Sequence, residues 1–406
     1  MMWELIQANR RKSVFIFIGM GLLLILIGYV FGSFYSPDNG GLIGIFFAII
    51  LWIILSMVSY FAGSNILLSV SGAKEITKEV HPQLYNVVEE MRIAANLPTM
   101  PKIYVITDPA PNAFATGIKP ENSAIAVTAG LLGTLNRDEL QGVIAHEMSH
   151  IVNRDILLMT FAGMMLGAIT LMAEIFGRSL WFGGGSRYRS KSSKGGGQGQ
   201  IIIMILALVL AILGPIMAQL LYFAISRRRE YLADASAVRL SRYPEGLASA
   251  LEKISQTTYD LKTANKVTAP MYIVNPLKKK GMQIANLTST HPPITERIRI
   301  LRSLHQGADF KSYQSAFDVV KGKHSTIIPQ SGLKEAGLFS IRQPLVGEQS
   351  VENLASNKRE VGDLIMKLND FRFINCTCGL KIKIPPDFKG DSVTCPKCGR
   401  VHTIIN

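Results

Sequence analysis

Residues 139–155 have the sequence ELQGVIAHEMSHIVNRD, which contains the pattern His146-Glu147-x-x-His150. Side chains four residues apart project from the same face of a helix, so both imidazoles could bind a single Zn²⁺. Glu147 would lie beside them, placed to act on a metal-bound water. Apolar residues at helical spacing and the acidic pair at 138–139 favour a helix here. The pattern also occurs by chance, on amphipathic helices with two surface histidines, so the rest of the chain must decide.

A second stretch supplies a candidate for a third ligand. A catalytic zinc site has three protein ligands and an open position for water, and the first pattern provides only two. Residues 226–237 have the sequence SRRREYLADASA, in which Glu230 is the natural candidate. Asp234 lies one helical turn further along the same face, where it could orient the site. The alternative is a charged helix face just outside a membrane-spanning segment.

Four long apolar runs account for the hydrophobic content of 48%, which is high for a soluble protein. They cover Val14–Phe34, Leu42–Val70, Ile156–Phe176 and Ile201–Ile225. The first run is free of charge and would form roughly 31 Å of helix, enough to cross a bilayer. A signal peptide is the competing interpretation, but the apolar core is too long and no small-residue cleavage site follows. The first two runs therefore predict a transmembrane hairpin.

The basic residues at 10–12 place the N-terminus in the cytoplasm by the positive-inside rule. Two crossings then return the region around His146 to the cytoplasmic side, at the membrane surface. The segment 177–200 conflicts with this rule. It is basic, but it would lie outside the cytoplasm if the third apolar run crossed the membrane completely. Either the third and fourth runs do not fully cross, or this loop breaks the rule. The net charge of +14 is more typical of cytoplasmic loops facing anionic lipid than of nucleic-acid binding in such a protein.

The region between the second and third apolar runs is soluble in character. Residues 102–106 and 123–128 alternate as strands do, and Pro111–Gly117 is a stretch of small residues between them. A strand at the border of a cleft can pair with an extended peptide through main-chain hydrogen bonds. A plain hairpin explains the same pattern equally well.

Three motifs occur in order along the chain: His146-Glu147-x-x-His150-x-x-Asn153-Arg154-Asp155, Ser226-x-x-Arg229-Glu230-Tyr231-x-Ala233-Asp234, and Thr290-His291-Pro292-Pro293-x-x-x-Arg297-Ile298. Together with the segment Asn-Ala-Phe-Ala-Thr-Gly at 112–117, they resemble the HtpX family of membrane zinc proteases, relatives of the CAAX prenyl proteases. The match spans about residues 80 to 302.

The resemblance implies a set of site residues. The zinc ligands would be His146, His150 and Glu230, with Glu147 as general base. Asn112 and His291 would line the cleft, His291 helping to stabilise the oxyanion, and Asp234 and Arg297 would be supporting residues. In this chemistry zinc polarises the scissile carbonyl, and the glutamate takes the proton of water and passes it to the leaving amine. Without the resemblance, His291 is an ordinary residue before a helix.

All four cysteines lie near the C-terminus, as Cys376-x-Cys378 and Cys395-Pro-Lys-Cys398. This excludes a disulfide framework for the main body of the chain. Four thiolates at this spacing suit a closed tetrahedral zinc site, as in a zinc ribbon, although C-x-x-C is commoner than the first pair. Two disulfides or a redox pair are the alternatives. The module is basic, so nucleic acid is a conceivable partner, but docking of a substrate or partner protein is at least as well supported.

The sequence as a whole predicts a mainly α-helical integral membrane protein. It would have a zincin-like metalloprotease domain with a small β-strand element and a C-terminal β zinc ribbon. We expect an N-terminal transmembrane hairpin at 1–71 and two halves of the catalytic domain at 72–155 and 226–303. Two further membrane segments at 156–225 would enclose a flexible loop at 177–200. A linker region at 304–370 and the ribbon at 371–406 would follow.

The predicted function is that of a membrane-bound zinc-dependent endopeptidase that degrades damaged or misfolded membrane proteins in quality control or stress response. We expect a multi-pass protein of the inner (plasma) membrane with its active site facing the cytoplasm. It would bind one catalytic zinc and a second, structural zinc in the ribbon. Its partners would be membrane protein or peptide substrates and the lipid bilayer, and not nucleic acid. The alternatives are a catalytically inactive membrane scaffold and a protein that binds partners through the zinc ribbon.

Overall fold

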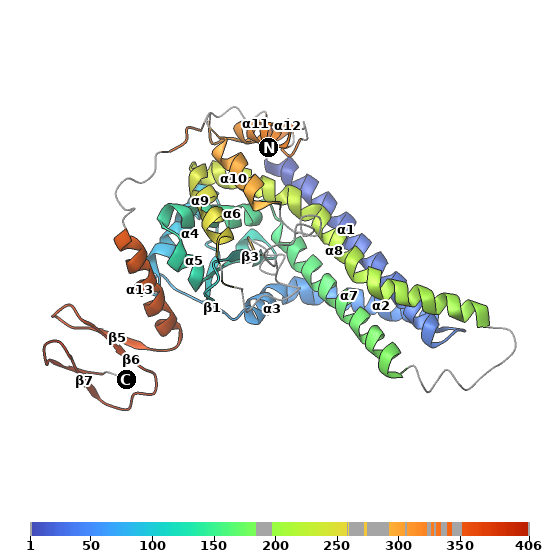
Figure 1. The fold of residues 1–406 in the computed structure, drawn as a ribbon, viewed down its shortest axis with the longest axis horizontal. Coiled ribbons are helices and arrows are strands. Elements are labelled where there is room, and N and C mark those ends of the chain that lie inside the picture. The colour runs from blue at the N-terminus through green and yellow to red at the C-terminus, as the bar shows by residue number, and fades with distance from the viewer. Residues whose placement is uncertain are drawn as a thin grey trace.

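The computed structural model describes residues 2–183, 197–257, 259, 272–273, 292–304, 307–322, 326–328, 330–333, 339–342 and 351–404. Figure 1 shows a mixed α/β head from which a bundle of four long helices extends. A small module of two hairpins follows helix α13 (Val351–Leu368), on the side of the head away from the bundle. The predicted fold class, a mainly helical membrane protein with a small sheet and a cysteine-rich end, is confirmed.

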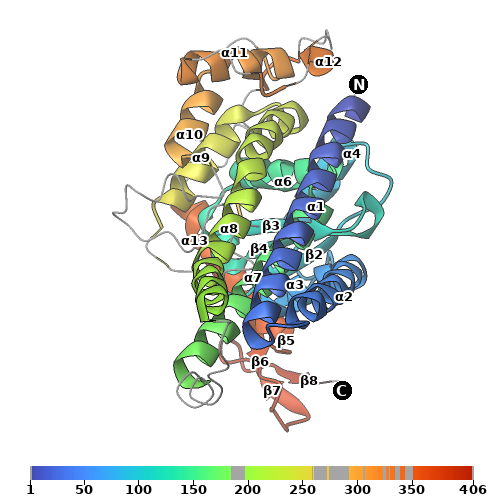
Figure 2. The ribbon, with the colours of Figure 1, turned by 90° about the vertical axis from the view of Figure 1, so that its right-hand side faces the viewer.

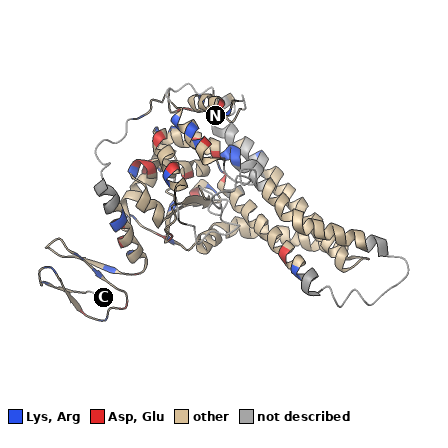
Figure 3. Cartoon of the chain, in the orientation of Figure 1, with Lys and Arg blue, Asp and Glu red and all other residues tan. Residues whose placement is uncertain are grey.

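The bundle consists of α1 (Met2–Tyr35), α2 (Gly40–Phe61), α7 (Ile156–Gly183) and α8 (Gly197–Ser241). Each contains a candidate membrane span: Val14–Tyr35, Gly40–Phe61, Met159–Arg178 and Ile201–Leu220. Figure 3 shows that the bundle is almost free of charged residues, whereas the head carries many. In Figure 1, α7 runs from the head to the far end of the bundle, and α8 returns from there to the head. This course favours full crossings by the third and fourth apolar runs.

Glycines bring α1 and α2 into backbone contact. A Cβ atom added at Gly32 would lie 2.0 Å from the carbonyl oxygen of Gly40, and one added at Gly44 would lie 2.0 Å from that of Gly28. Both helices thus carry a pair of glycines at the G-x-x-x-G spacing, which lets membrane helices approach closely. Close approach matters here because lipid provides no hydrophobic driving force between helices, so van der Waals packing holds the pair together.

The second apolar run, expected as one segment over Leu42–Val70, forms two helices. Ala62 leaves helical geometry, with φ −124° and ψ −7°, and α3 (Gly63–Val70) continues in the head. Leu67 and Leu68 are buried in an apolar cluster of the head. The run is therefore longer than a membrane span because its last part is buried in protein.

A four-stranded sheet forms part of the head. Its strands are β1 (Ala73–Glu75), β2 (Lys102–Ile106), β3 (Ala113–Gly117) and β4 (Ser123–Thr128). The order is β1-β2-β4-β3, with β2 and β4 parallel and the two outer strands antiparallel to their neighbours. The two stretches predicted as strands are β2 and β4. The small-residue stretch contributes β3, an edge strand that contacts helix α6 (Arg137–Val152).

The rest of the head is helical. Besides α6 it contains α4 (Pro82–Ala94), α5 (Ala129–Thr134), α9 (Pro244–Ser255), α10 (Ile294–Arg302), α11 (Phe310–Lys321) and α12 (Gln330–Leu333). α6 is central: every residue after its first is buried, and it packs against α4, α8, α9 and β3. A capping box begins it, because Asn136 Oδ1 accepts from the Glu139 N–H at 2.9 Å and the Glu139 carboxylate accepts from the Asn136 N–H at 2.9 Å.

The chain after α10 packs back onto the head. α11 buries Phe310, Tyr313 and Phe317 in the main core, and α13 packs against α5. Two hairpins follow: β5 (Arg372–Asn375) with β6 (Lys381–Ile384), and β7 (Ser392–Thr394) with β8 (Val401–Thr403). Lys381 and Lys383 of β6 each lie 2.8 Å from a carboxylate oxygen of Asp363 in α13, which joins the hairpin module to that helix.

Candidate metal centre and active site

Three side chains from two helices converge inside the head. His146 and His150 come from α6, and Glu230 comes from the part of α8 beyond the membrane span. None is more than 5% exposed. His146 Nε2 lies 3.5 Å from Glu230 Oε2, and His150 Nε2 lies 3.6 Å from Glu230 Oε1. The structure thus brings together the three residues for which the sequence predicts zinc ligation.

These distances fit a shared metal ion better than direct hydrogen bonds. Two atoms that each lie about 2.0–2.1 Å from a tetrahedral zinc are about 3.4 Å apart, whereas N–H···O bonds are usually about 2.9–3.0 Å long. His146 Nε2 and Glu147 Oε1 are buried and have no hydrogen-bond partner among the described residues. Buried polar atoms without partners are rare in folded proteins and indicate an ion or a water. The imidazole and carboxylate donors therefore fit Zn²⁺.

A buried ion pair lies behind His146. Asp234 Oδ1 is 2.9 Å from His146 Nδ1. Arg297 donates to Asp234 twice, from Nε to Oδ2 at 2.8 Å and from Nη2 to Oδ1 at 2.7 Å. Burial opposes ionisation of Asp234, but the Arg297 guanidinium and the His146 hydrogen bond outweigh it and hold the pKa of Asp234 below its ordinary value. An ionised Asp234 keeps the proton of His146 on Nδ1, so the lone pair of Nε2 is available to bind a metal ion.

A second carboxylate, whose role no sequence pattern indicates, lies behind His150. Asp155 Oδ2 is 3.5 Å from His150 Nδ1, and Arg229 Nε is 3.5 Å from Asp155 Oδ1. The chain returns Asp155 to the histidine because α6 ends at Val152 and Arg154 adopts a left-handed φ of 56°. Both Asp155 and Arg229 belong to the motifs quoted above. No helical spacing rule, however, connects a residue beyond a helix end to a ring nitrogen within that helix.

Glu147 lies on a neighbouring face of α6. Its side chain is buried, and the backbone N–H of Ala115 in β3 hydrogen-bonds to it. Burial raises the pKa of Glu147, and the two histidines and the Ala115 N–H offset part of that rise. A buried carboxylate with a raised pKa, next to a metal position, is suited to accept and release a proton near neutral pH.

The edge of β3 that does not pair with β4 contacts residues 272 and 273. The Ile273 N–H donates to the Ala113 carbonyl at 2.9 Å, and the Ile273 carbonyl accepts from Arg297 Nη1 at 3.3 Å. The Tyr272 ring packs edge-on against Phe114, with ring centroids 5.1 Å apart, and both Tyr272 and Ile273 are buried. An extended peptide that pairs with this end of β3 would therefore have to take the place of Ile273.

Asn112 directly precedes β3 and is buried. Its Oδ1 accepts from the Ala113 N–H at 3.1 Å, and its own N–H donates to Thr128 Oγ1 at 2.8 Å. These bonds fix Asn112 at the start of the edge strand. His291, the other residue expected to line the cleft, lies outside the described residues.

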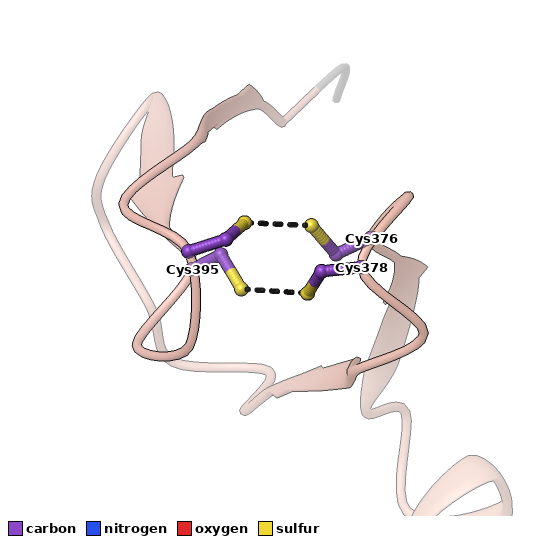
Figure 4. Close-up of side chains that lie close together, drawn as sticks. Cys376, Cys378 and Cys395 are labelled. Carbon is purple, nitrogen blue, oxygen red and sulfur yellow. Dashed lines mark hydrogen bonds between the residues drawn. The ribbon is translucent and has the colours of Figure 1, made fainter.

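The four cysteines form a second group of candidate metal ligands. Cys376 Sγ is 3.5 Å from Cys398 Sγ, and Cys378 Sγ is 3.6 Å from Cys395 Sγ, so each contact joins one pair to the other (Figure 4). These separations are far longer than a disulfide bond of about 2.05 Å and close to the roughly 3.8 Å between thiolates that share a tetrahedral zinc. The Cys378 backbone N–H and the His402 side chain lower the pKa of Cys376, which favours the thiolate that metal binding requires.

Comparison with known proteins gives the following matches. The model of peptidase family M48 matches residues 78–305, which include both histidines, Glu230 and Arg297. The chain is 48% identical over 302 residues to a protein named Protease HtpX homolog from Dictyoglomus turgidum, covering 74% of this chain and 94% of the relative. Proteins of the same name are 45% identical over 304 residues in Caldanaerobacter subterraneus (75% and 98% covered) and 40% identical over 304 residues in Streptococcus gordonii (75% and 100% covered). The crystal structure of S. mikatae Ste24p aligns with 23% identity and a TM-score of 0.39, over 73% of this chain and 66% of that one.

Proposed function

The chain belongs to peptidase family M48 and is a membrane-bound zinc metallopeptidase, and we propose that His146, His150 and Glu230 hold its catalytic zinc. The support is the arrangement of two imidazoles and a carboxylate whose donor atoms all lie within 4.8 Å of one another in the interior of the head. Three protein ligands leave a fourth position open for water and substrate, as a catalytic rather than a structural zinc site requires.

Glu147 is the proton carrier in this proposal. Bound zinc would supply Lewis-acid polarisation of the scissile carbonyl and would make the attacking water more acidic. Glu147 accepts a proton from that water and then delivers it to the leaving amine. The hydrogen bond from the Ala115 N–H orients the carboxylate, and Oε1 has no hydrogen-bond partner among the described residues, so it is available for the proton.

The remaining predicted residues orient a zinc ligand or line the substrate cleft. Asp234 and Arg297 orient His146, because the ion pair fixes the ring and its tautomer. Asn112 lines the cleft at the start of β3. On the family resemblance, His291 donates to the developing oxyanion, an interaction worth roughly 3 kcal/mol of transition-state stabilisation in comparable enzymes.

The substrates we assign are damaged or misassembled membrane proteins. Glu230 is roughly ten residues past the end of the fourth span at Leu220, about 15 Å along a helix that rises about 1.5 Å per residue. Asp155 directly precedes α7, which contains the third span. A segment that leaves the bilayer would therefore meet the site within a short distance. Such a segment would bind in extended form along β3, in place of Ile273.

The orientation and the second metal complete the proposal. Basic residues 10–12 precede the first span, and α1 begins at the end of the bundle that joins the head (Figure 1). By the positive-inside rule the active site then faces the cytoplasm, in the inner membrane. The four cysteines would hold a second, structural zinc, and the ribbon that they fold would recruit substrates.

The single observation that carries the proposal is Glu147, buried beside three potential metal ligands. The test compares wild type with Glu147→Gln, each purified under chelation and then given zinc and an unfolded test protein in detergent. We expect zinc-dependent cleavage by the wild type and none by the variant, with equal zinc content in both. Equal cleavage by both proteins would exclude Glu147 as the base.

A membrane scaffold without catalytic activity is the other candidate, because buried His and Glu ligands also occur in structural zinc sites. It predicts that wild type and Glu147→Gln bind zinc equally and that neither cleaves the test protein or itself. The same experiment therefore separates the two functions.

A further inference from the structure

A cavity of about 720 Å³ lies where three helices of the head end. Its lining includes the residues that directly follow α4, α6 and α8. Figure 2 shows the molecule from the side of the bundle, with α6 behind α8 and α1 and with α11 above them. Three arginines line the cavity, Arg154, Arg239 and Arg242, against one acidic residue, Glu121. Basic side chains therefore outnumber acidic ones in the lining of the cavity.

Two of these arginines stand where a helix end normally has glycine. Arg154 follows α6 with φ 56°, and Arg242 follows α8 with φ 54°. Asn96, which follows α4 and also lines the cavity, has φ 52°. Glycine adopts this left-handed conformation without steric cost, whereas other side chains do not. Strain of this kind persists where a side chain is needed for something other than ending the helix.

Two arginines and one amide side chain at the cavity are available to a ligand. The guanidinium groups of Arg154 and Arg242 are exposed and make no hydrogen bond or ion pair with the described part of the chain. Arg242 lies over the Phe339 ring at 5.0 Å, which leaves the in-plane N–H groups free to bind an oxyanion. Asn153, 2% exposed, also lines the cavity, and its side-chain nitrogen has no partner among the described residues.

A structural explanation accounts for only part of this arrangement. A basic residue near a helix C-terminus is favoured by the helix dipole, wherever that terminus lies. The dipole does not require arginine at the left-handed position itself. It also gives no reason for three helix ends, three arginines and an unpaired amide to line one cavity.

The place of the cavity indicates its ligand. Among the lining residues, Arg154 is about five residues before Met159, where the third span begins, or roughly 7 Å at the rise of a helix, whereas Arg242 is 22 residues past Leu220, where the fourth span ends. The basic residues 10–12 immediately precede the first span, at the same end of the bundle. Basic pockets beside membrane helices bind the headgroups of anionic lipids, and arginine pairs with phosphate through two parallel hydrogen bonds. We propose that this cavity binds the phosphate-bearing headgroup of an anionic phospholipid from the leaflet next to the head.

The test measures lipid binding to the full chain in detergent. The probes are short-chain phosphatidylglycerol, phosphatidylcholine with the same acyl chains, and inorganic phosphate at matched ionic strength. Thermal unfolding and native mass spectrometry report the binding, and neither depends on proteolysis. We expect at least tenfold tighter binding of phosphatidylglycerol than of phosphatidylcholine, and no shift of the unfolding temperature by inorganic phosphate.

The variants replace two arginines at a time. An arginine near an anionic lipid contributes about fivefold to binding, so Arg154→Gln with Arg242→Gln should lower the affinity for phosphatidylglycerol about 30-fold. Arg154→Lys with Arg242→Lys keeps the charge and loses the paired geometry, so it should lose only about three- to tenfold. The control, Arg299→Gln with Arg359→Gln, removes two exposed charges outside the cavity and should leave the affinity unchanged.

Each remaining outcome overturns the proposal. An unchanged preference in the glutamine pair would show that the cavity does not bind the lipid, and an equal loss in the control pair would assign the preference to overall charge. An equal shift by inorganic phosphate would make this a site for a soluble phosphate. If the double glutamine variant does not fold, the double lysine variant provides the test. Full retention of its affinity for phosphatidylglycerol would contradict a role for the two parallel hydrogen bonds between arginine and phosphate.

Discussion

Asp155 Oδ2 lies 3.5 Å from His150 Nδ1, so each histidine of the metal centre has its own carboxylate behind it. Asp155 directly precedes α7, and its partner Arg229 belongs to α8. Both of these helices belong to the four-helix bundle and contain a candidate membrane span. The orientation of His150 is therefore held by one residue that directly precedes α7 and one on α8, whereas that of His146 is held by Asp234 of α8 and Arg297 of α10.

The first prediction concerns this contact. Asp155→Asn removes the negative charge behind His150, and we expect the free zinc concentration needed for half-maximal proteolysis to rise about 10- to 100-fold. Cleavage of an unfolded soluble protein as a function of buffered free zinc measures it, because that substrate is not expected to depend on the cysteine site. Asp38→Asn, an exposed change at the far end of the bundle, serves as the control and should leave the curve in place. A curve that is identical for Asp155→Asn and wild type would refute the positioning role.

The second prediction concerns the ion pair behind His146. Arg297→Ala leaves the carboxylate of Asp234 buried without the guanidinium that pairs with it. Removal of one partner from a buried pair typically costs about 3–5 kcal/mol. We expect a loss of this size in the free energy of unfolding, measured by denaturant titration in detergent. Arg299→Ala, exposed on the same helix, should change it by less than about 0.5 kcal/mol. Equal effects of the two changes would contradict the assignment.

Helical spacing made the two histidines, Glu147 and the Glu230–Asp234 pair predictable from the sequence, because each relation lies within one helix. The lengths of the apolar runs likewise predicted the four membrane helices. The end of the fourth membrane helix could not be predicted from the length of its apolar run. The run ended at Ile225 and the next motif began at Ser226, yet both belong to the 45-residue helix α8. A change of side-chain polarity does not interrupt the backbone hydrogen bonds of a helix, so composition marks the membrane surface and not the helix end.

Contacts between distant segments were not predictable. Asp155 reaches His150 only because Arg154 turns the chain at the end of α6, and Ile273 reaches β3 from a segment that carries no recognisable pattern. The break at Ala62 is similar, since it depends on where the head buries Leu67. Each of these features is fixed by tertiary packing, which overrides local preference and leaves no periodic trace in a single sequence.

The third prediction concerns the contact between α1 and α2. Gly32→Ala would place a Cβ 2.0 Å from the Gly40 carbonyl oxygen, so the helices must separate. We expect the unfolding temperature in detergent to fall and the free energy of unfolding to drop by more than about 1 kcal/mol. Gly19→Ala on the same helix meets nothing within 4 Å and should be neutral or stabilising by up to about 1 kcal/mol. If both variants behave alike, close backbone contact does not hold this hairpin.

The fourth prediction concerns the metal content. We expect two zinc ions per full chain and one after Cys376→Ser with Cys395→Ser, counted by elemental analysis of purified protein. The catalytic zinc should remain, because the cysteine site lies beyond α13 and shares no residue with the histidine site. Cleavage of an unfolded soluble protein should then be unchanged, while cleavage of some membrane substrates weakens if the ribbon recruits them. One zinc ion per wild-type chain would instead indicate that the four cysteine thiols bind no zinc.

The fifth prediction concerns the edge of β3. Ile273→Pro removes the N–H that occupies the Ala113 carbonyl and keeps the carbonyl that accepts from Arg297. A hydrogen bond of this kind contributes about 1 kcal/mol, so a substrate strand that competes with it should bind about fivefold more tightly. We expect KM for an extended peptide to fall about fivefold with kcat unchanged, and Ile273→Val, which keeps the N–H, to match the wild type. Thermal unfolding identifies a variant that is merely misfolded. A rise in KM with intact folding would mean that Ile273 belongs to the substrate site and does not compete with it.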